Sequence, residues 1–290
     1  MPAATNLKFC SLALLMLAAI LAATAVFGPV RAQEPDGVNV PGFWDPNRRF
    51  TKPDRTKVRA IRFLTEQESP PFSFTGPDGL PAGFNVDIAR AVCEELDIPC
   101  TIQELKWDLL TAAIEEGRGD AIIAPVPITA ENREKYLFTH PYLGRPARFV
   151  ATKKSRLQII SNATLADTKV GVVEGSPHAR FIETYFPQTE RVPFEDHAAL
   201  RAALQGGALE VVFTDALSAS VWLNSQSAQK CCIFVGEAYT DLGFFGEGIA
   251  VAVDPQRKEL RDAIDFAMSR IYFNGRYFEI FLRYFPRGYY

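Results

Sequence analysis

Residues 83–102 read GFNVDIARAVCEELDIPCTI, a helical pattern that is followed after a short turn by the start of a strand. Apolar residues recur at helical spacing between Phe84 and Leu96, at Val86, Ile88, Ala89, Val92 and Cys93. The segment Cys100-Thr101-Ile102 is typical of a strand. A helix that leads directly into a strand predicts an α/β fold.

The same alternation of strands and helices extends along the chain. Before residue 149 we predict strands at 58–63 and 121–124 and a helix at 109–116. Beyond it we predict strands at 169–173 and 211–214 and helices at 177–185, 198–205, 260–274 and 277–284. The pattern predicts βαβ units in two halves, although no sequence repeat relates them.

The composition is that of an ordinary globular protein of one or two domains, with 290 residues and 48% hydrophobic content. Lys and Arg number 31 against 34 Asp and Glu, which gives a formal net charge of −3. Because no strongly basic surface is expected, the composition does not indicate nucleic acid as a partner.

The N-terminus predicts a secretory signal peptide at residues 1–32, cleaved after Ala32. Lys8 precedes an apolar run from about Ser11 to Val26. The alternative is an uncleaved membrane anchor, because the run is nearly long enough to span a bilayer. A cleaved signal predicts a periplasmic protein. Residues 33–57 then form a leader rich in Pro and Asp, for which Phe43 and Trp44 are candidate docking residues.

Export predicts an oxidising compartment for the four cysteines that follow the signal. A helix and a short turn can bring Cys93 and Cys100 within disulfide distance, and we favour this bridge over free thiols. Cys231 and Cys232 are neighbours, and since a bond between neighbours is strained, we expect two buried thiols. No His or Cys lies at zinc-ligand spacing from them, so we expect no metal.

A series of short motifs runs in order between residues 58 and 286. They are PFSF at 71–74, DG at 78–79, GFNVDIA at 83–89, GDAII at 119–123, IT at 128–129 followed by Arg133, FTHPY at 138–142, VGV at 170–172, EGS at 174–176 and FTD at 213–215. Together they resemble the extracellular solute-binding proteins of polar amino-acid ABC transporters, which are the family 3 proteins with the periplasmic-binding-protein type 2 fold.

This resemblance implies two lobes, each a mostly parallel sheet flanked by helices. Residues 58–147 plus 248–290 would form lobe one and residues 148–247 lobe two, joined by hinge strands near Arg148 and Gly248. It implies a periplasmic receptor that captures a small amino-acid-like polar ligand by hinge closure and delivers it to a membrane ABC permease. We expect a monomer without catalytic residues or cofactor. The spacing of Cys93 and Cys100 also resembles the disulfide of histidine- and lysine/arginine/ornithine-binding members.

An amino acid zwitterion needs a cation at its carboxylate and an acid at its ammonium. The resemblance assigns Arg133, which follows Thr129, to the carboxylate, because a guanidinium binds a carboxylate through two donors. The spacing between the two residues is one longer than in the histidine-binding pattern, and the alternative for Arg133 is a solvated charge on a helix. Asp215 ends a predicted strand and is the candidate for the ammonium, with a helix N-cap as its alternative.

The remaining candidate ligand residues are Gly175, Ser176, Trp107, Glu66 and Glu174. Gly175 and Ser176 precede a helix, so their N–H groups form either an anion site or a plain turn and cap. Trp107 is either a pocket wall or a core residue. Glu66 and Glu174 suit a cationic or polar ligand side chain, or are solvated.

Several residues depart from the histidine-binding pattern and remove donors from the expected site. Hydroxyl residues are replaced by Ala124, Pro125, Pro127 and Pro177, and Ser69 stands where an aromatic lid is usual. Each lost hydrogen bond to a charged group is worth about 1.5–3 kcal/mol. The ligand is therefore expected to be an amino acid held less tightly, a modified amino acid, an opine-like compound or another small acid.

Two other classes of function stay open. One is an enzyme similar to periplasmic cyclohexadienyl dehydratases, with Glu66, Glu174 or His178 as the acid. The other is an accessory protein that binds another periplasmic protein through Trp44 in the leader or through the Tyr-rich end of the chain.

Overall fold

The computed structural model describes Trp44 and residues 50–54, 56–157, 159–286 and 288–290. The predicted signal peptide 1–32, Phe43 and most of the predicted leader 33–57 lie outside the described residues. Among the helices of the described ranges, none has the length and apolarity that crossing a membrane requires.

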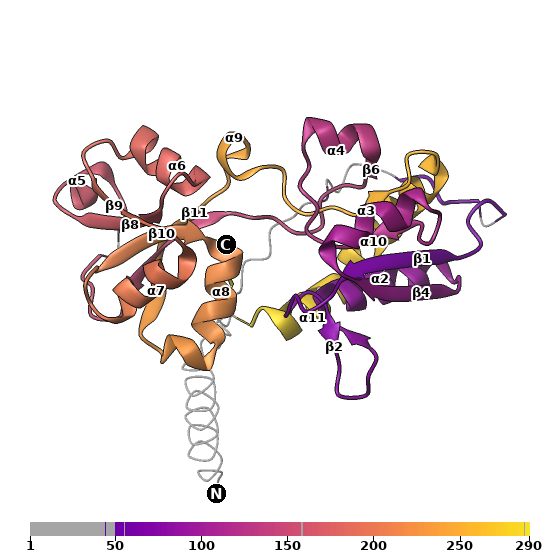
Figure 1. Ribbon diagram of the computed structural model, residues 1–290, viewed down its shortest axis with the longest axis horizontal. Coiled ribbons are helices and arrows are strands. Elements are labelled where there is room, and N and C mark those ends of the chain that lie inside the picture. Colours follow the sequence, from indigo (N-terminus) through magenta and orange to yellow (C-terminus); the bar gives the residue numbers. More distant parts are fainter. Residues whose placement is uncertain (1–43, 45–49, 55, 158, 287) are drawn as a thin grey trace, which may run out of the picture. The chain divides into compact units, whose positions relative to one another are not determined.

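The first sheet has five strands in the order β4-β1-β5-β12-β6 (Figure 1). Its strands are β1 (Ile61–Glu66), β4 (Cys100–Leu105), β5 (Ala121–Ile122), β6 (Leu137–Phe138) and β12 (Ala252–Val253). β4, β1 and β5 are parallel, whereas β12 runs antiparallel to both β5 and β6. Its associated helices are α2 (Phe84–Leu96), α3 (Trp107–Glu115), α4 (Ala130–Lys135), α10 (Lys258–Phe273) and α11 (Arg276–Tyr284). A small hairpin, β2 (Phe74–Thr75) with β3 (Pro81–Ala82), precedes α2.

The second sheet also has five strands, in the order β11-β7-β10-β8-β9. Its strands are β7 (Ala147–Thr152), β8 (Lys169–Val173), β9 (Glu190–Phe194), β10 (Val211–Asp215) and β11 (Cys232–Tyr239). β8 is parallel to β9 and β10, and β7 is antiparallel to β10 and β11. The helices of this part are α5 (Asn162–Leu165), α6 (Pro177–Tyr185), α7 (His197–Gln205), α8 (Ala216–Asn224), the 3-10 helix η1 (Gln226–Ala228) and α9 (Leu242–Phe245). Two mixed sheets flanked by helices confirm the predicted α/β fold class.

Two chain segments connect the sheets. The chain leaves β6 at Phe138 and enters β7 at Ala147, and it returns between Tyr239 of β11 and Ala252 of β12. The connections pair with each other, because the Ile249 N–H donates to the Leu143 carbonyl at 2.7 Å. The predicted lobe boundaries fall within or beside these connections, and the division into moving lobes stays a prediction.

Helix α2 has the predicted bounds because local geometry fixes both its ends. Gly83 precedes it at a φ of +124°, where a β-carbon would also collide with the Phe72 carbonyl. Asp97 ends it in the left-handed conformation. The buried face of α2 packs with α10 and α11, and Tyr277, Phe281 and Tyr289 belong to the same core cluster. The aromatic end of the chain therefore forms core of the first sheet's helices.

Trp44 confirms the predicted docking of the leader. Its side chain is only 4% exposed, and its ring lies 5.3 Å from that of Phe50 and 5.5 Å from that of His140, between centroids. Since Trp44 is used inside the fold, it is not the partner-binding residue that the accessory hypothesis required.

The cysteines give one confirmed prediction and one that was wrong. Cys93 and Cys100 form a disulfide with their Cα atoms 6.2 Å apart. Cys231 and Cys232 are also joined by a disulfide, where two thiols were expected. The expectation rested on the strain of a bond between neighbours; in the structure Cys231 follows a turn in which Gln229 and Lys230 have positive φ, and only Cys232 belongs to β11.

Candidate functional site

Three candidate residues follow parallel strands of the first sheet. Glu66 ends β1, Trp107 comes two residues after β4, and Thr129 lies in the segment that leaves β5. Since the carboxyl ends of parallel strands share one sheet edge, the topology brings these residues to the same edge.

Trp107 is the first residue of α3 and is 45% exposed. The alternative of a core tryptophan is therefore wrong, and the indole is accessible for stacking on a ligand. Glu66 is partly buried, and its backbone carbonyl accepts a hydrogen bond from the Ser73 hydroxyl. That bond ties the end of β1 to the loop before β2.

Thr129 is the N-cap of the short helix α4, and Arg133 lies within that helix. The Thr129 hydroxyl accepts from the Asn132 N–H at 3.1 Å, so this side chain serves as the N-cap. The Arg133 guanidinium lies 2.6 and 2.7 Å from the two carboxylate oxygens of Glu247, a residue of the return connection. Both side chains are about half exposed, at 49% and 47%. Arg133 thus pairs with a carboxylate of the protein itself, through Nη2 alone rather than through two nitrogens.

Two further candidates follow parallel strands of the second sheet. Val212 of β10 pairs with Gly171 of β8, and the third residue beyond that pair is Asp215 on one strand and Glu174 on the other. Glu174 is exposed, whereas Asp215 is only 4% exposed. The register therefore places two acids at the carboxyl edge of this sheet.

Gly175 and Ser176 form the turn into α6. Gly175 has a φ of +66°, which favours glycine. The Ser176 hydroxyl accepts from the Ala179 N–H at 3.1 Å and its own N–H donates to the Val173 carbonyl, while Pro177 supplies no N–H. Of the two interpretations, the turn and cap is the one present here, and the Ser176 N–H, one of the two predicted anion donors, is already engaged.

The buried carboxylate of Asp215 has two partners. One oxygen accepts from the Ser218 N–H at 2.7 Å, which makes Asp215 the N-cap of α8, as its alternative interpretation held. The other oxygen accepts from Arg145 Nε at 3.3 Å. Arg145 lies in the connection between β6 and β7, and the sequence analysis missed it because 70 residues separate the two.

The partners of both predicted anchors converge on the connections. Arg145 and Glu247 line the same small cavity of about 70 Å³, together with Leu242 and Phe245 of α9. A cation and an anion therefore line one cavity, each paired with one of the two predicted anchors.

His178 is a further residue near Asp215. Its ring stacks on that of Phe245, with centroids 5.2 Å apart. Burial lowers the pKa of His178 to about 4, although the nearby Asp215 carboxylate acts in the opposite direction. The imidazole is thus neutral at pH 7, which argues against His178 as the acid but leaves the other two candidates of the enzyme hypothesis, Glu66 and Glu174.

Comparison with known proteins identifies a matching family model and related sequences. The sequence model described as "Bacterial extracellular solute-binding proteins, family 3" matches residues 61–287. The chain is 31% identical over 232 residues to "Putative ABC transporter arginine-binding protein 2" of Escherichia coli (strain K12), covering 80% of this chain and 93% of that protein. It is 33% identical over 229 residues to "L-arginine-binding protein" of Pseudomonas aeruginosa, with 78% and 88% covered.

Among solved structures, the L-cystine solute receptor of Neisseria gonorrhoeae in its unliganded open conformation is similar in fold. The TM-score is 0.70 at 20% identity, covering 81% of this chain and 96% of that chain. The relatives named above are binding proteins rather than enzymes.

Proposed function

The chain belongs to the bacterial extracellular solute-binding proteins of family 3, and from this premise we propose that it captures an amino acid with a cationic side chain, arginine above all, for a membrane ABC permease. The predicted export signal would place it in the periplasm. We expect it to act there as a monomer.

The observation that carries this proposal is the state of the two predicted anchors. Arg133 holds the Glu247 carboxylate, and Asp215 holds the Arg145 guanidinium. A zwitterionic ligand offers the same two charges, so its carboxylate exchanges with Glu247 and its ammonium with Arg145. The exchange keeps Arg133 and Asp215 paired in both states, which avoids leaving a buried charge at Asp215.

The other candidates favour a cationic ligand side chain. Glu66 and Glu174 each end or follow a strand at a carboxyl sheet edge, and Trp107 presents an accessible indole face. A guanidinium pairs with carboxylates and also stacks on aromatic rings. The two curated relatives described above are named as arginine-binding proteins, which adds support.

Hinge closure is part of the proposal. We assign the hinge to residues 139–146 and 240–251, because these segments join the sheets and carry Arg145 and Glu247. This assignment moves one predicted hinge position, since Arg148 lies inside β7, while Gly248 falls within the return connection. Exchange of the two ion pairs would then couple ligand capture to the movement of these segments.

The test is a titration of refolded, ligand-free protein that follows melting temperature and heat of binding. L-Arginine is expected to raise the melting temperature, because a ligand that binds only the native state stabilises it by RT ln(1 + [L]/Kd). Agmatine lacks the carboxylate and 5-guanidinopentanoate lacks the α-ammonium, so both should bind at least tenfold more weakly, as expected for about 1.5–3 kcal/mol per charged hydrogen bond. The proposal would be overturned if no cationic amino acid raised the melting temperature or gave a heat of binding. It would also be overturned if agmatine bound as tightly as L-arginine.

A further inference from the structure

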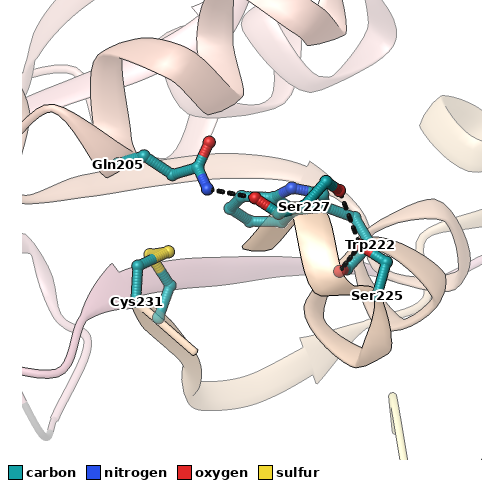
Figure 2. Close-up of a disulfide and its surroundings, with 6 residues drawn as sticks. Gln205, Trp222, Ser225, Ser227 and Cys231 are labelled. Atoms are coloured by element: carbon teal, nitrogen blue, oxygen red, sulfur yellow. Dashed lines mark hydrogen bonds between the residues drawn. A yellow bond between two sulfur atoms is a disulfide. The ribbon is translucent and has the colours of Figure 1, made fainter. Parts of the chain in front are cut away.

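The Cys231–Cys232 disulfide lies on a well-fixed loop between α8 and β11 (Figure 2). Gln205 of α7 donates to the Ser227 carbonyl at 2.6 Å, and the Ser225 hydroxyl donates to the Trp222 carbonyl at 2.6 Å. The Cys231 carbonyl in turn accepts from the Lys153 N–H at 2.9 Å. The disulfide therefore has a defined position beside the second sheet.

The two sulfur-bearing residues differ in accessibility. Cys232 is 1% exposed and belongs to a core cluster that includes Trp222 and Ala228. Cys231 is only partly buried and lines a cavity of about 1070 Å³. An attacking thiolate can therefore approach the disulfide from the side of Cys231, and access decides which sulfur is attacked.

Cations predominate among the charged residues that line the cavity beside Cys231. Four basic residues line it, Lys153, Lys154, Arg156 and Lys230, against the single acid Glu210. All four are exposed. A cavity with this charge concentrates small anions and disfavours small cations.

The other disulfide of the chain provides a contrast within the same molecule. Cys93 and Cys100 also line a cavity, of about 700 Å³, but its charged residues are the acids Glu94 and Asp97 with the single base Arg90. The two disulfides thus stand in surroundings of opposite charge.

We propose that Cys231–Cys232 is a modification site that forms mixed disulfides with small anionic thiols. The incoming thiolate attacks Sγ of Cys231, the bond between Cys231 and Cys232 breaks, and Cys232 leaves as a thiolate that takes a proton from water. A second thiolate then attacks the thiol sulfur of the mixed disulfide, which releases the oxidised thiol dimer and leaves both cysteines reduced. The thiol is the reductant, so the step needs no further reactant.

The test compares 2-mercaptoethanesulfonate with cysteamine, two thiols of similar size and opposite charge. The folded protein is treated with each, free thiols are trapped by alkylation, and adducts are assigned by peptide mass spectrometry. For each disulfide the measured quantity is the rate of modification by the anionic thiol divided by the rate with the cationic thiol. At low ionic strength this ratio should be about tenfold higher at Cys231 than at the Cys93–Cys100 pair. The preference should largely disappear in about 1 M salt, where charges are screened within a few ångströms.

Charge variants locate the effect. A variant with Gln at positions 153, 154, 156 and 230 should lose the preference for the anionic thiol. A control with Gln at four exposed cations of the first sheet's elements and of the segment before them, Lys57, Arg118, Lys135 and Lys258, has the same change of net charge and should keep it. The salt series on the unaltered protein remains decisive if a variant fails to fold. The proposal is wrong if Cys231 forms no adduct, if the adduct lies on Cys232, or if both disulfides show the same charge preference.

Discussion

Replacing Glu247 by Gln should tighten the binding of L-arginine. The Glu247 carboxylate lies 2.6 and 2.7 Å from the Arg133 guanidinium, at the position proposed for the ligand carboxylate. Glutamine keeps the shape of the side chain but removes the charge that competes with the ligand. The free energy of this ion pair is therefore no longer lost when the ligand binds.

The size of the effect follows from the exposure of the pair. Both side chains are about half exposed, 49% and 47%, which places the pair among surface ion pairs worth about 0.2–1 kcal/mol. The dissociation constant should therefore fall by about 1.5- to 5-fold. Arg133→Gln should raise it by about 10- to 150-fold, because a charged hydrogen bond to the ligand is lost.

Isothermal titration with L-arginine measures these changes. Glu131→Gln is the matched control. It also removes one carboxylate charge, but from α4 itself, and it breaks the pair with Lys135 instead of the pair with Arg133. It should leave the dissociation constant unchanged. In an Arg133→Gln background, Glu247→Gln should have no further effect. The reasoning is refuted if Glu247→Gln weakens binding, or if it tightens binding equally with and without Arg133.

Three further predictions concern stability in urea unfolding. Because folding lowers the pKa of His178 from about 6.5 to about 4, the protein should lose about 2 kcal/mol as the pH falls from 7.5 to 4.5, and His178→Gln should abolish that part of the loss; an unchanged pH profile would contradict this. Asp120→Asn should cost about 2–3 kcal/mol, since this buried carboxylate accepts from the side chains of two arginines, whereas Glu116→Gln at an exposed pair should cost under about 0.5 kcal/mol. Trp44→Ala should cost about 3 kcal/mol and Trp107→Ala far less, because only the first is buried; equal losses would show that the leader does not dock.

The elements that sequence predicts well here are those with local boundary signals. Helix α6 and strand β8 have the predicted bounds, because Ser176 and Pro177 mark where the helix begins and an apolar run marks the strand. Helix α8 was anticipated only as the helix that Asp215 would cap, and its extent was not predicted because it is buried on most sides, so that no polar face alternates with an apolar one. The two-residue strand β12 was missed because only its partners in the sheet, β5 and β6, define it.

The residues of the site also divide into those with a local sequence signal and those defined only by distant partners. Asp215 could be predicted as a cap or a ligand residue from its place after an apolar strand, and it is the cap. Its partner Arg145 and the partner of Arg133, Glu247, could not be predicted, since they are 70 and 114 residues away in the chain and no periodicity links them. Pairing over such separations depends on how the two connections fold back on the sheets.

The strand order of the first sheet also determines when that sheet can form. β12 lies between β5 and β6, yet it is synthesised after every strand of the second sheet. The second sheet draws all its strands from the continuous segment 147–239, so it can fold while the first still lacks a central strand. Until β12 is available, the strand edges of β5 and β6 that it will cover stay unpaired. Unpaired edges favour aggregation and chaperone binding. In refolding, where the whole chain is present, the long sequence separation between β5 and β12 still delays their pairing, so pulsed amide exchange should protect β7, β8 and β10 before β5.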